Sequence, residues 1–469
     1  MSYLLTAPET LAAAATDVDG IAAAIHSANA GAAGRTSGLL AAAGDEVSAA
    51  LAALFSAYSA EYQAVVKQAS VFQSDFANAL SNAASAYTQA EALNGTLLSA
   101  PAAATLAPPI TALIMGGTNN PVPDAKYLTN VFNRYIKPIY STASPVVLPT
   151  AEQFWPVTPG LGNMTYNQSV TTGVTLLDNA INALVPTQDV ITFGYSQSAS
   201  IVNNEILNLM AAGSPHVGDL SFILAAAGNN PNGGILARFP GFYLPILDVP
   251  FNGALPANNP YETYVYTAQY DGVAHAPQYP LNILADINAV MGYFYVHGNY
   301  PTISATDFSH AIQLPTSPGY AGNTQYYMFL TQDLPLLQPI RDIPYAGPVL
   351  ADLVQPPLRV MVDLGYSDYG YADLPTPAGL INIPNPVNVA YYLGKGLLQA
   401  PYGAAVEIGV QAGLWGPEYF PTEYPWVPSI NPGLNFYFGP QFSQPPVTAL
   451  SVLSGALGDV LHIIPPIFN

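Results

Sequence analysis

The stretch Asp189-Val-Ile-Thr-Phe-Gly-Tyr-Ser-Gln-Ser198 decides the fold of the larger part of this chain. An apolar, β-branched run ends at Gly194, and the residues after Ser198 place apolar side chains on one helical face. The pattern predicts a strand, a sharp turn with Ser196 at its tip, and a helix. Small residues two positions either side of such a serine let strand and helix approach closely. Gly194 meets that demand fully, and Ser198 meets it less well. We therefore interpret Ser196 as a candidate nucleophile.

A serine that attacks a carbonyl needs hydrogen-bond donors for the oxyanion that forms. In α/β hydrolases one backbone N–H comes from the residue after the nucleophile and the other from a loop after an early strand. The first role falls to Gln197. The run Ile110 to Met115 is a short apolar strand that leads into Gly116-Gly-Thr118, so we expect Gly117 and Thr118 to fill the second role.

The serine also needs a histidine base, which follows it in the chain order of this fold class. The histidines in a plausible range are His275, His297 and His310. We favour His297, because it lies on a Gly/Asn-containing loop just after a strand-like run, Tyr293 to Val296. His275 remains a candidate substrate-contacting group.

A carboxylate must hold the histidine in the correct tautomer. Asp271 follows the predicted strand Tyr261 to Tyr270, and loops at the carboxyl ends of parallel strands gather active-site residues. Asp248 is the alternative acid, although the apolar stretch before it is interrupted by prolines. We predict Ser196, His297 and Asp271 as the catalytic residues, with no cofactor and no metal.

Composition narrows the class of protein. Half of the 469 residues are hydrophobic, but Gly, Pro, Asn or Asp interrupts each apolar run before about 18 residues, so we expect no transmembrane span. A net charge of −20 argues against a nucleic-acid partner. The chain has no cysteine, which excludes disulfides and thiol catalysis. It also lacks a positively charged leader before an apolar core, so we expect no ordinary cleaved signal peptide.

Residues 1–94 differ from the rest because they are rich in alanine and helical in period. The pattern predicts a helix from about Pro8 to Asn29, a glycine-rich turn, and a long second helix with an apolar stripe from Leu51 to Leu80. Such a hairpin has too little core to cover its apolar faces. It should pack on a partner or on the chain's own C-terminal part.

Beyond a linker at 95–108, strands alternate with helices, which predicts a mainly parallel sheet covered on both faces. The predicted fold is an α/β-hydrolase domain at 109–383, preceded by the N-terminal α-helical hairpin. Residues 384–469 are rich in Pro, Gly and Tyr, and we expect an irregular extension packed on the hydrolase domain.

The N-terminal part resembles the PE domain of the mycobacterial PE/PPE proteins. The residues that carry the resemblance are Pro8-Glu9, the alanine-rich hairpin and Tyr87-Thr-Gln-Ala-Glu91. The resemblance implies that Tyr87 and Glu91 belong to a type VII secretion signal read by that secretion machinery. It also implies a helical PPE-family partner for the hairpin and a secreted or cell-surface (cell-wall) location.

The larger part, from about 110 to 330, resembles the PE-PPE domain, a cutinase-like serine-hydrolase domain. The resemblance rests on residues 116–118, 194–198, 269–272, 280–292 and 297–300. It implies esterase or lipase activity on lipid or other acyl esters through Ser196, His297 and Asp271. Two alternatives stay open: an acyltransferase for envelope lipids that uses the same residues, and a non-catalytic surface or host-interaction module.

Overall fold

The computed structural model describes residues 8–37, separate residues between 40 and 84, and residues 108–462 apart from 246, 367–369 and 439–445. The chain forms two compact units, Met1–Leu106 and Ala107–Asn469. Tyr87, Glu91 and nearly all of the expected linker at 95–108 lie outside the described residues.

The first unit is helical. Helix α1 spans Pro8–Ser37 and is longer than the helix expected from the sequence. It continues through Gly31 and Gly34 because the alanines around them are the strongest helix formers. Helical residues recur among those described after Asp45, and the Tyr62 hydroxyl donates to Asn29 Oδ1 at 2.9 Å. This contact joins α1 to the segment that follows it in the chain.

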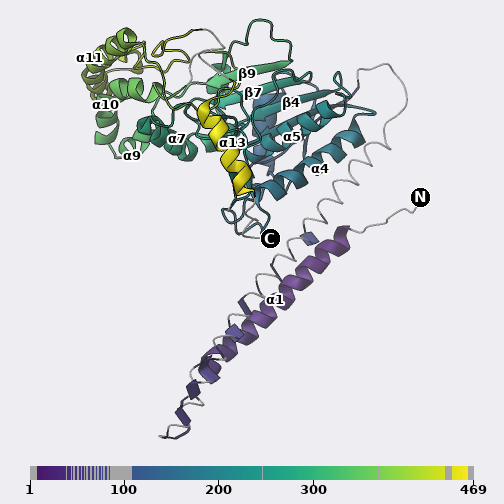
Figure 1. Cartoon of the computed structure of the whole chain (residues 1–469). Helices are drawn as coiled ribbons and strands as arrows, with labels where there is room; N and C mark the ends of the chain where they lie inside the picture. Colours follow the sequence, from purple (N-terminus) through teal and green to yellow (C-terminus); the bar gives the residue numbers. More distant parts are fainter. Residues whose placement is uncertain are drawn as a thin grey trace. The chain divides into compact units, whose positions relative to one another are not determined.

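The second unit is built on a seven-stranded sheet with the order β2-β1-β3-β4-β7-β9-β8 (Figure 1). Every neighbouring pair is parallel except β8 and β9. The strands are β1 (Ile110–Ile114), β2 (Ser144–Val147), β3 (Asp189–Tyr195), β4 (Leu220–Ala225), β7 (Glu262–Ala268), β8 (Ile312–Gln313) and β9 (Thr324–Phe329). Two further strands, β5 (Tyr243–Leu244) and β6 (Val249–Pro250), form a separate antiparallel pair.

Helices cover both faces of the sheet, as the alternation along β3 shows. Phe193 packs on the buried ring of Tyr135 at a centroid distance of 5.2 Å. The next residue, Gly194, faces Val202 of helix α5. Successive residues of a strand point to opposite faces, so the two contacts lie on different sides of the sheet. The larger unit is therefore an α/β-hydrolase fold with a mostly parallel sheet.

The helices between and after the strands have the following bounds. They are α3 (Ala125–Val131), α4 (Tyr166–Leu184), α5 (Gln197–Ala211), α6 (Ile235–Arg238), α7 (Ile283–Tyr295), α8 (Ala305–Ser309), α9 (Gln338–Arg341), α10 (Ala346–Asp363), α11 (Pro386–Gln411) and α13 (Ala449–Leu461). The described residues also form a π-helical turn, η1 (Phe132–Ile136), and the 3₁₀ turns η2 (His297–Thr302), η3 (Pro335–Leu337) and η4 (Pro417–Tyr419). Within the described ranges, none of the helices is both long and apolar enough to cross a membrane.

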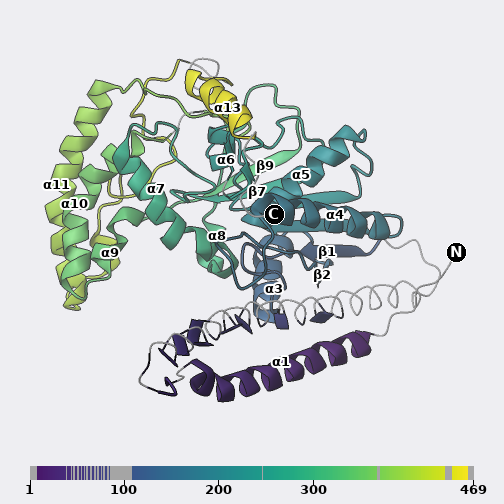
Figure 2. The ribbon, with the colours of Figure 1, turned by 60° about the horizontal axis from the view of Figure 1, so that its bottom comes forward.

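Two expectations about local structure were wrong. Tyr293–Tyr295 is the last turn of α7 rather than a strand. The chain after residue 384 is not irregular throughout, because it holds α11 and α13. Figures 1 and 2 show α11 beside α10, away from the sheet. Helix α11 carries glycines because its neighbours are close: a Cβ on Gly403 would lie 1.8 Å from the Trp426 ring.

Candidate active site

The turn after β3 holds Ser196 in a backbone conformation that few residues adopt. Ser196 has φ 56° and ψ −113° and precedes the first residue of α5. The close approach of strand and helix explains Gly194, since a Cβ there would lie 2.5 Å from the carbonyl oxygen of Ser198. Ser198 is accommodated because its hydroxyl accepts from Tyr195 N at 2.8 Å and donates to Tyr195 O at 3.1 Å. Its side chain therefore stabilises the turn.

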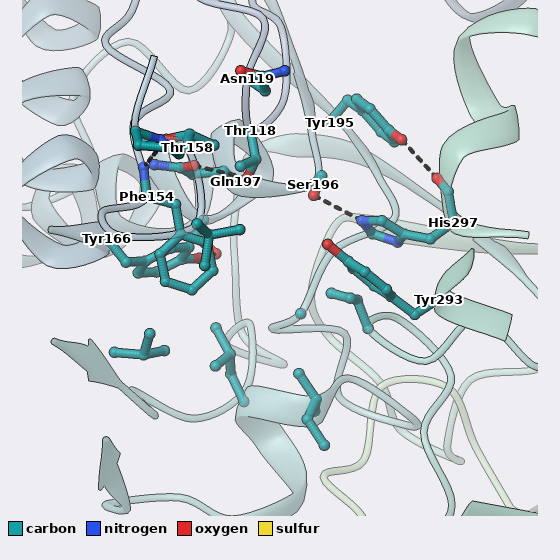
Figure 3. Close-up of a pocket in the computed structure, with 18 of the residues that line it drawn as sticks. Thr118, Asn119, Phe154, Thr158, Tyr166, Tyr195, Ser196, Gln197, Tyr293 and His297 are labelled. Atoms are coloured by element: carbon teal, nitrogen blue, oxygen red, sulfur yellow. Dashed lines mark hydrogen bonds between the residues drawn. The ribbon is translucent and has the colours of Figure 1, made fainter. Parts of the chain in front are cut away.

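The structure brings Ser196, His297 and Asp271 together as one chain of hydrogen bonds. Ser196 Oγ lies 2.8 Å from His297 Nε2 (Figure 3). His297 Nδ1 lies 2.8 Å from Asp271 Oδ1 and 3.0 Å from Oδ2. Asp271 follows β7, and His297 begins η2 just after α7. In this arrangement Nδ1–H donates to the carboxylate and Nε2 is free to accept the serine proton.

Asp271 is fully buried and remains ionised through its partners. Burial by itself raises the pKa of this carboxyl, but the His297 charge and hydrogen bonds from His297, Val273 N and Tyr300 together bring the pKa below its usual value. The Tyr300 hydroxyl donates to Oδ2 at 2.7 Å, and Val273 N donates to Oδ1 at 2.8 Å. These partners leave the carboxylate in one orientation toward His297.

Two tyrosines, Tyr195 and Tyr293, contact His297 and restrict its orientation. The Tyr195 hydroxyl donates to the His297 carbonyl oxygen at 2.6 Å. The Tyr293 ring stacks on the imidazole at a centroid distance of 5.5 Å and an interplanar angle of 21° (Figure 3). The imidazole therefore has little freedom to turn away from Ser196.

The loop after β1 is fastened to α5 through the Gln197 side chain. The Thr118 hydroxyl donates to Gln197 Oε1 at 2.8 Å. Gln197 Nε2 donates to the Gln153 carbonyl and to Ser169 Oγ, both at 2.9 Å. Because a carbonyl oxygen only accepts, Nε2 must face Gln153 and Oε1 must face Thr118. The Thr118 hydroxyl proton is thus already donated to Gln197. An oxyanion at Ser196 would therefore be bound by backbone N–H groups.

The same loop is supported from the segment after β2. Asn119 N donates to the carbonyl oxygen of Glu152 at 2.9 Å. Glu152 has φ 45° and is fully buried, and its Oε1 accepts from the Thr150 hydroxyl. Its Oε2 has no hydrogen-bond partner among the described residues. Burial raises the pKa of Glu152 to about 8, so this side chain is mostly protonated at neutral pH.

A cavity of ≈580 Å³ opens beside Ser196. Thr118, Gln197 and His297 reach it, so the candidate nucleophile, base and oxyanion loop share one space. Most of its remaining lining is aromatic or aliphatic, including Phe154, Val157, Tyr166, Ile235, Leu236 and Val249. A space of this kind suits an apolar group attached to a carbonyl.

The other candidates from the sequence lie elsewhere. Asp248 accepts from the Thr165 and Tyr243 hydroxyls at 2.5 and 2.8 Å, so it fastens the start of α4. His275 accepts from Tyr270 N at 3.1 Å, and burial and then the Arg238 charge lower its pKa to about 3, which keeps it neutral. His310 ends α8 at an exposed position.

Sequence reasoning missed several residues of the site. Tyr300 belongs to the 297–300 motif, yet nothing in its spacing indicated a bond to Asp271. Gln153 and Ser169 lie far from the serine in sequence, and no local pattern marks them as partners of Gln197. Across the described residues, no group of three or more His, Asp or Glu side chains is placed to hold a metal ion.

The fold and the arrangement around Ser196 are of the α/β-hydrolase class. Comparison with known proteins gives the family. The chain belongs to the mycobacterial PE family, because a PE family protein is similar to it over its whole length and the PE family matches residues 4–94. It also carries a PE-PPE domain, which matches residues 141–367.

Three proteins of Mycobacterium tuberculosis illustrate the range of similarity. PE family protein PE3 is 54% identical, with all of both chains covered. Esterase PE16 is 44% identical over 85% of this chain and 76% of its own length. The SL1278 acyltransferase Chp1 is 31% identical over 51% of this chain and 57% of its own length.

Proposed function

We propose that this chain is a carboxylic-ester hydrolase, an esterase or lipase, that works through an acyl-enzyme on Ser196. The observation that carries the proposal is the continuous hydrogen-bond chain from Ser196 through His297 to the buried carboxylate of Asp271. The similarity to a protein named esterase PE16 supports the same reaction class.

In the proposed reaction, Ser196 Oγ attacks the ester carbonyl and its proton passes to His297 Nε2. Asp271 stabilises the imidazolium that forms. The carbonyl oxygen becomes an oxyanion, which the N–H of Gln197 and the loop of Gly117 and Thr118 stabilise. The Gln197 N–H is available because the first N–H groups of a helix have no acceptor within it. His297 then protonates the leaving alcohol, and the same steps with water release the acid.

The backbone around the oxyanion loop is adapted to this role. A Cβ on Gly117 would lie 2.8 Å from the Tyr195 ring. A Cβ on Gly116 would lie 2.0 Å from the carbonyl oxygen of Asn120. Only glycine lets this loop pass so close to the turn that carries Ser196.

The test is covalent labelling of the full chain with a fluorophosphonate, together with hydrolysis of p-nitrophenyl esters of graded chain length. Ser196→Ala should abolish both signals. Ser309→Ala removes an exposed hydroxyl at the end of α8 and should change neither. A folded wild-type chain that is neither labelled nor active would refute the proposal and favour a non-catalytic surface or host-interaction module.

A second candidate is acyl transfer with the same residues, and the relative named SL1278 acyltransferase Chp1 favours it. The acyl group on Ser196 would then pass to a sugar or lipid hydroxyl in place of water. Product analysis separates the two reactions: hydrolysis accumulates free fatty acid, and transfer accumulates a new ester.

We also propose that the N-terminal unit serves export and pairing. Membership in the PE family supports a helical PPE-family partner for this unit and a cell-surface location. The finer proposal is type VII secretion with Tyr87 and Glu91 in the signal. Replacement of both by alanine in a mycobacterial host should leave the protein inside the cell, and normal export of that variant would contradict it.

A further inference from the structure

Helix α7 carries many of its bulky apolar side chains on the outside. Its buried positions hold small or polar residues, namely Ala285, Asn288, Ala289 and Gly292. Four of its large apolar side chains are 48% to 69% exposed, namely Ile283, Ile287, Val290 and Phe294. We call these four residues the α7 stripe. Leu284, by contrast, packs against the buried cluster that includes Tyr270. A surface helix of a globular domain normally buries its apolar stripe, so the pattern of α7 is reversed.

The spacing shows that the stripe is one continuous surface. Its members are separated by four, three and four residues, which places them on one side of a helix. Leu281, just before the helix, is also 68% exposed. Single exposed apolar residues need no explanation, but a contiguous row of them marks an interaction site.

The C-terminal end of the α7 stripe lies beside the candidate active site. Tyr293 precedes the last stripe residue, Phe294, and is partly exposed. The same Tyr293 side chain lines the cavity beside Ser196 and stacks on His297 (Figure 3). Whatever covers the stripe therefore adjoins the cavity.

The small inward residues of α7 bring the helix close to the loop that carries Asp271. A Cβ on Gly292 would lie 1.8 Å from the Tyr270 carbonyl oxygen, and a Cβ on Gly272 would lie 2.3 Å from that of Ala289. Large side chains cannot point inward there. The face of α7 that meets the domain is thus set by packing, and the apolar residues are left on the other face.

The charges near the stripe limit the kind of partner. Asp286 lies on α7, and Asp342 accepts a long hydrogen bond of 3.4 Å from Tyr295. The neighbouring Arg341 pairs with Asp333 and Asp352. Anionic headgroups would meet unfavourable carboxylates here, whereas an uncharged surface would not.

We propose that the α7 stripe docks on an uncharged lipid surface, from which an acyl ester passes directly to Ser196. This inference rests on the proposed ester hydrolase function. A protein seated on the stripe would adjoin the cavity and hinder entry, whereas a lipid surface supplies the substrate at the same place. Apolar side chains on one face of a helix that lies in the interface are the usual means of such attachment.

The test uses the full chain and vesicles of phosphatidylcholine that contain trioleoylglycerol. Binding is measured by co-flotation, and hydrolysis of dissolved p-nitrophenyl acetate is measured in parallel. The double variant Ile287→Glu with Val290→Glu should weaken vesicle binding about tenfold or more. Hydrolysis of the dissolved ester should stay at the wild-type rate. Vesicles rich in phosphatidylglycerol should bind the wild type more weakly than phosphatidylcholine does.

The matched control is Leu176→Glu, which places the same charge on a 40% exposed leucine of α4. It should bind vesicles as the wild type does. Equal flotation of the wild type and the double variant would overturn the docking surface. A wild-type dimer that the double variant converts to a monomer would assign the stripe to a second copy and overturn it as well. If the wild type does not hydrolyse the dissolved ester, the hydrolase proposal is refuted. The flotation assay would still show whether the α7 stripe binds vesicles.

Discussion

The Thr118 hydroxyl donates to Oε1 of Gln197 at 2.8 Å, and this bond joins the loop after β1 to the first residue of α5. The two proposed oxyanion donors therefore sit on segments that a side-chain hydrogen bond holds in register. Gln153 fixes the orientation of the carboxamide from its other end. Preorganised donors of this kind act in the transition state without having to move.

The first prediction concerns this bond. Thr118→Val keeps the backbone N–H and the side-chain size but removes the hydroxyl. We expect kcat for a p-nitrophenyl ester to fall roughly 10- to 100-fold with little change in KM, because the ground state does not use the oxyanion donors. Thr118→Ser restores the hydroxyl and should recover most of the rate. An unchanged kcat in Thr118→Val would show that the hydroxyl does not position the loop.

The second prediction separates the two aspartates that are candidates for the catalytic acid, Asp271 and Asp248. Asp271→Asn should lower kcat on the order of 10⁴-fold, since an amide cannot hold the correct tautomer of His297 or stabilise its charge. Asp248→Asn should leave the turnover of folded molecules unchanged. It weakens the bonds to Thr165 and Tyr243, so we expect about 1–2 kcal/mol less unfolding free energy. Kinetics and denaturation of both variants check this, and the reverse pattern would make Asp248 the functional acid.

The third prediction is a dependence of stability on pH. Burial raises the pKa of Glu152 from 4.5 to about 8, and that of Glu205 to about 7. A raised pKa means that the folded state holds the proton more tightly than the unfolded state. The contribution to stability is therefore complete below 4.5 and is lost as the pH rises toward about 8. The unfolding free energy should fall by a few kcal/mol across this window.

Two variants identify which carboxyl group causes each part of this pH dependence of the unfolding free energy. Glu152→Gln should remove most of the pH dependence near the upper end of the window, above the range in which Glu205 titrates. Glu205→Gln should flatten the part that ends near pH 7. Denaturant titrations at a series of pH values give the comparison. If Glu152→Gln keeps the wild-type slope, the buried carboxyl is not the group that titrates.

The fourth prediction concerns the turn at Ser196. Gly194→Ala places a Cβ against the Ser198 carbonyl oxygen. Because that oxygen belongs to the backbone, it cannot move aside as a flexible side chain could. We expect lost fluorophosphonate labelling and a strong loss of stability. Ser198→Gly removes the hydroxyl bonds to Tyr195 but fits the usual small residue. It should keep its labelling at a cost of about 1 kcal/mol, and loss of labelling in Ser198→Gly would show that its hydroxyl is required.

Much of the site follows from sequence because its residues stand where strands end. Asp271 follows β7, and Ser196 follows β3, so strand patterns alone placed them at one edge of a parallel sheet. The interpretation of Tyr293 to Val296 as a strand was wrong because aromatic and β-branched residues favour strands locally, while the i, i+4 spacing through α7 continued the helix.

The C-terminal helices were missed for a different reason. Gly396, Gly403 and Gly409 lie within α11, and such residues lower helix propensity. Gly396 and Gly403 are demanded by tertiary contacts, as with Gly396, where a Cβ would lie 2.8 Å from the backbone nitrogen of Pro357 in α10. Long-range packing of this sort leaves no periodic signal in the sequence. The bonds of Gln153 and Ser169 to Gln197 are hidden for the same reason.

The groups around Ser196 come from widely separated parts of the chain: the serine and its base are 101 residues apart, and Gln197 is 79 residues from Thr118. A chain that has folded only as far as α5 thus holds Ser196 without His297 as its base and without the carboxylate of Asp271. Reactivity therefore requires the segments after β7 and α7, which carry Asp271 and His297, to pack against the turn after β3. The recovery of fluorophosphonate labelling during refolding is therefore expected to report when these distant segments have come together around Ser196.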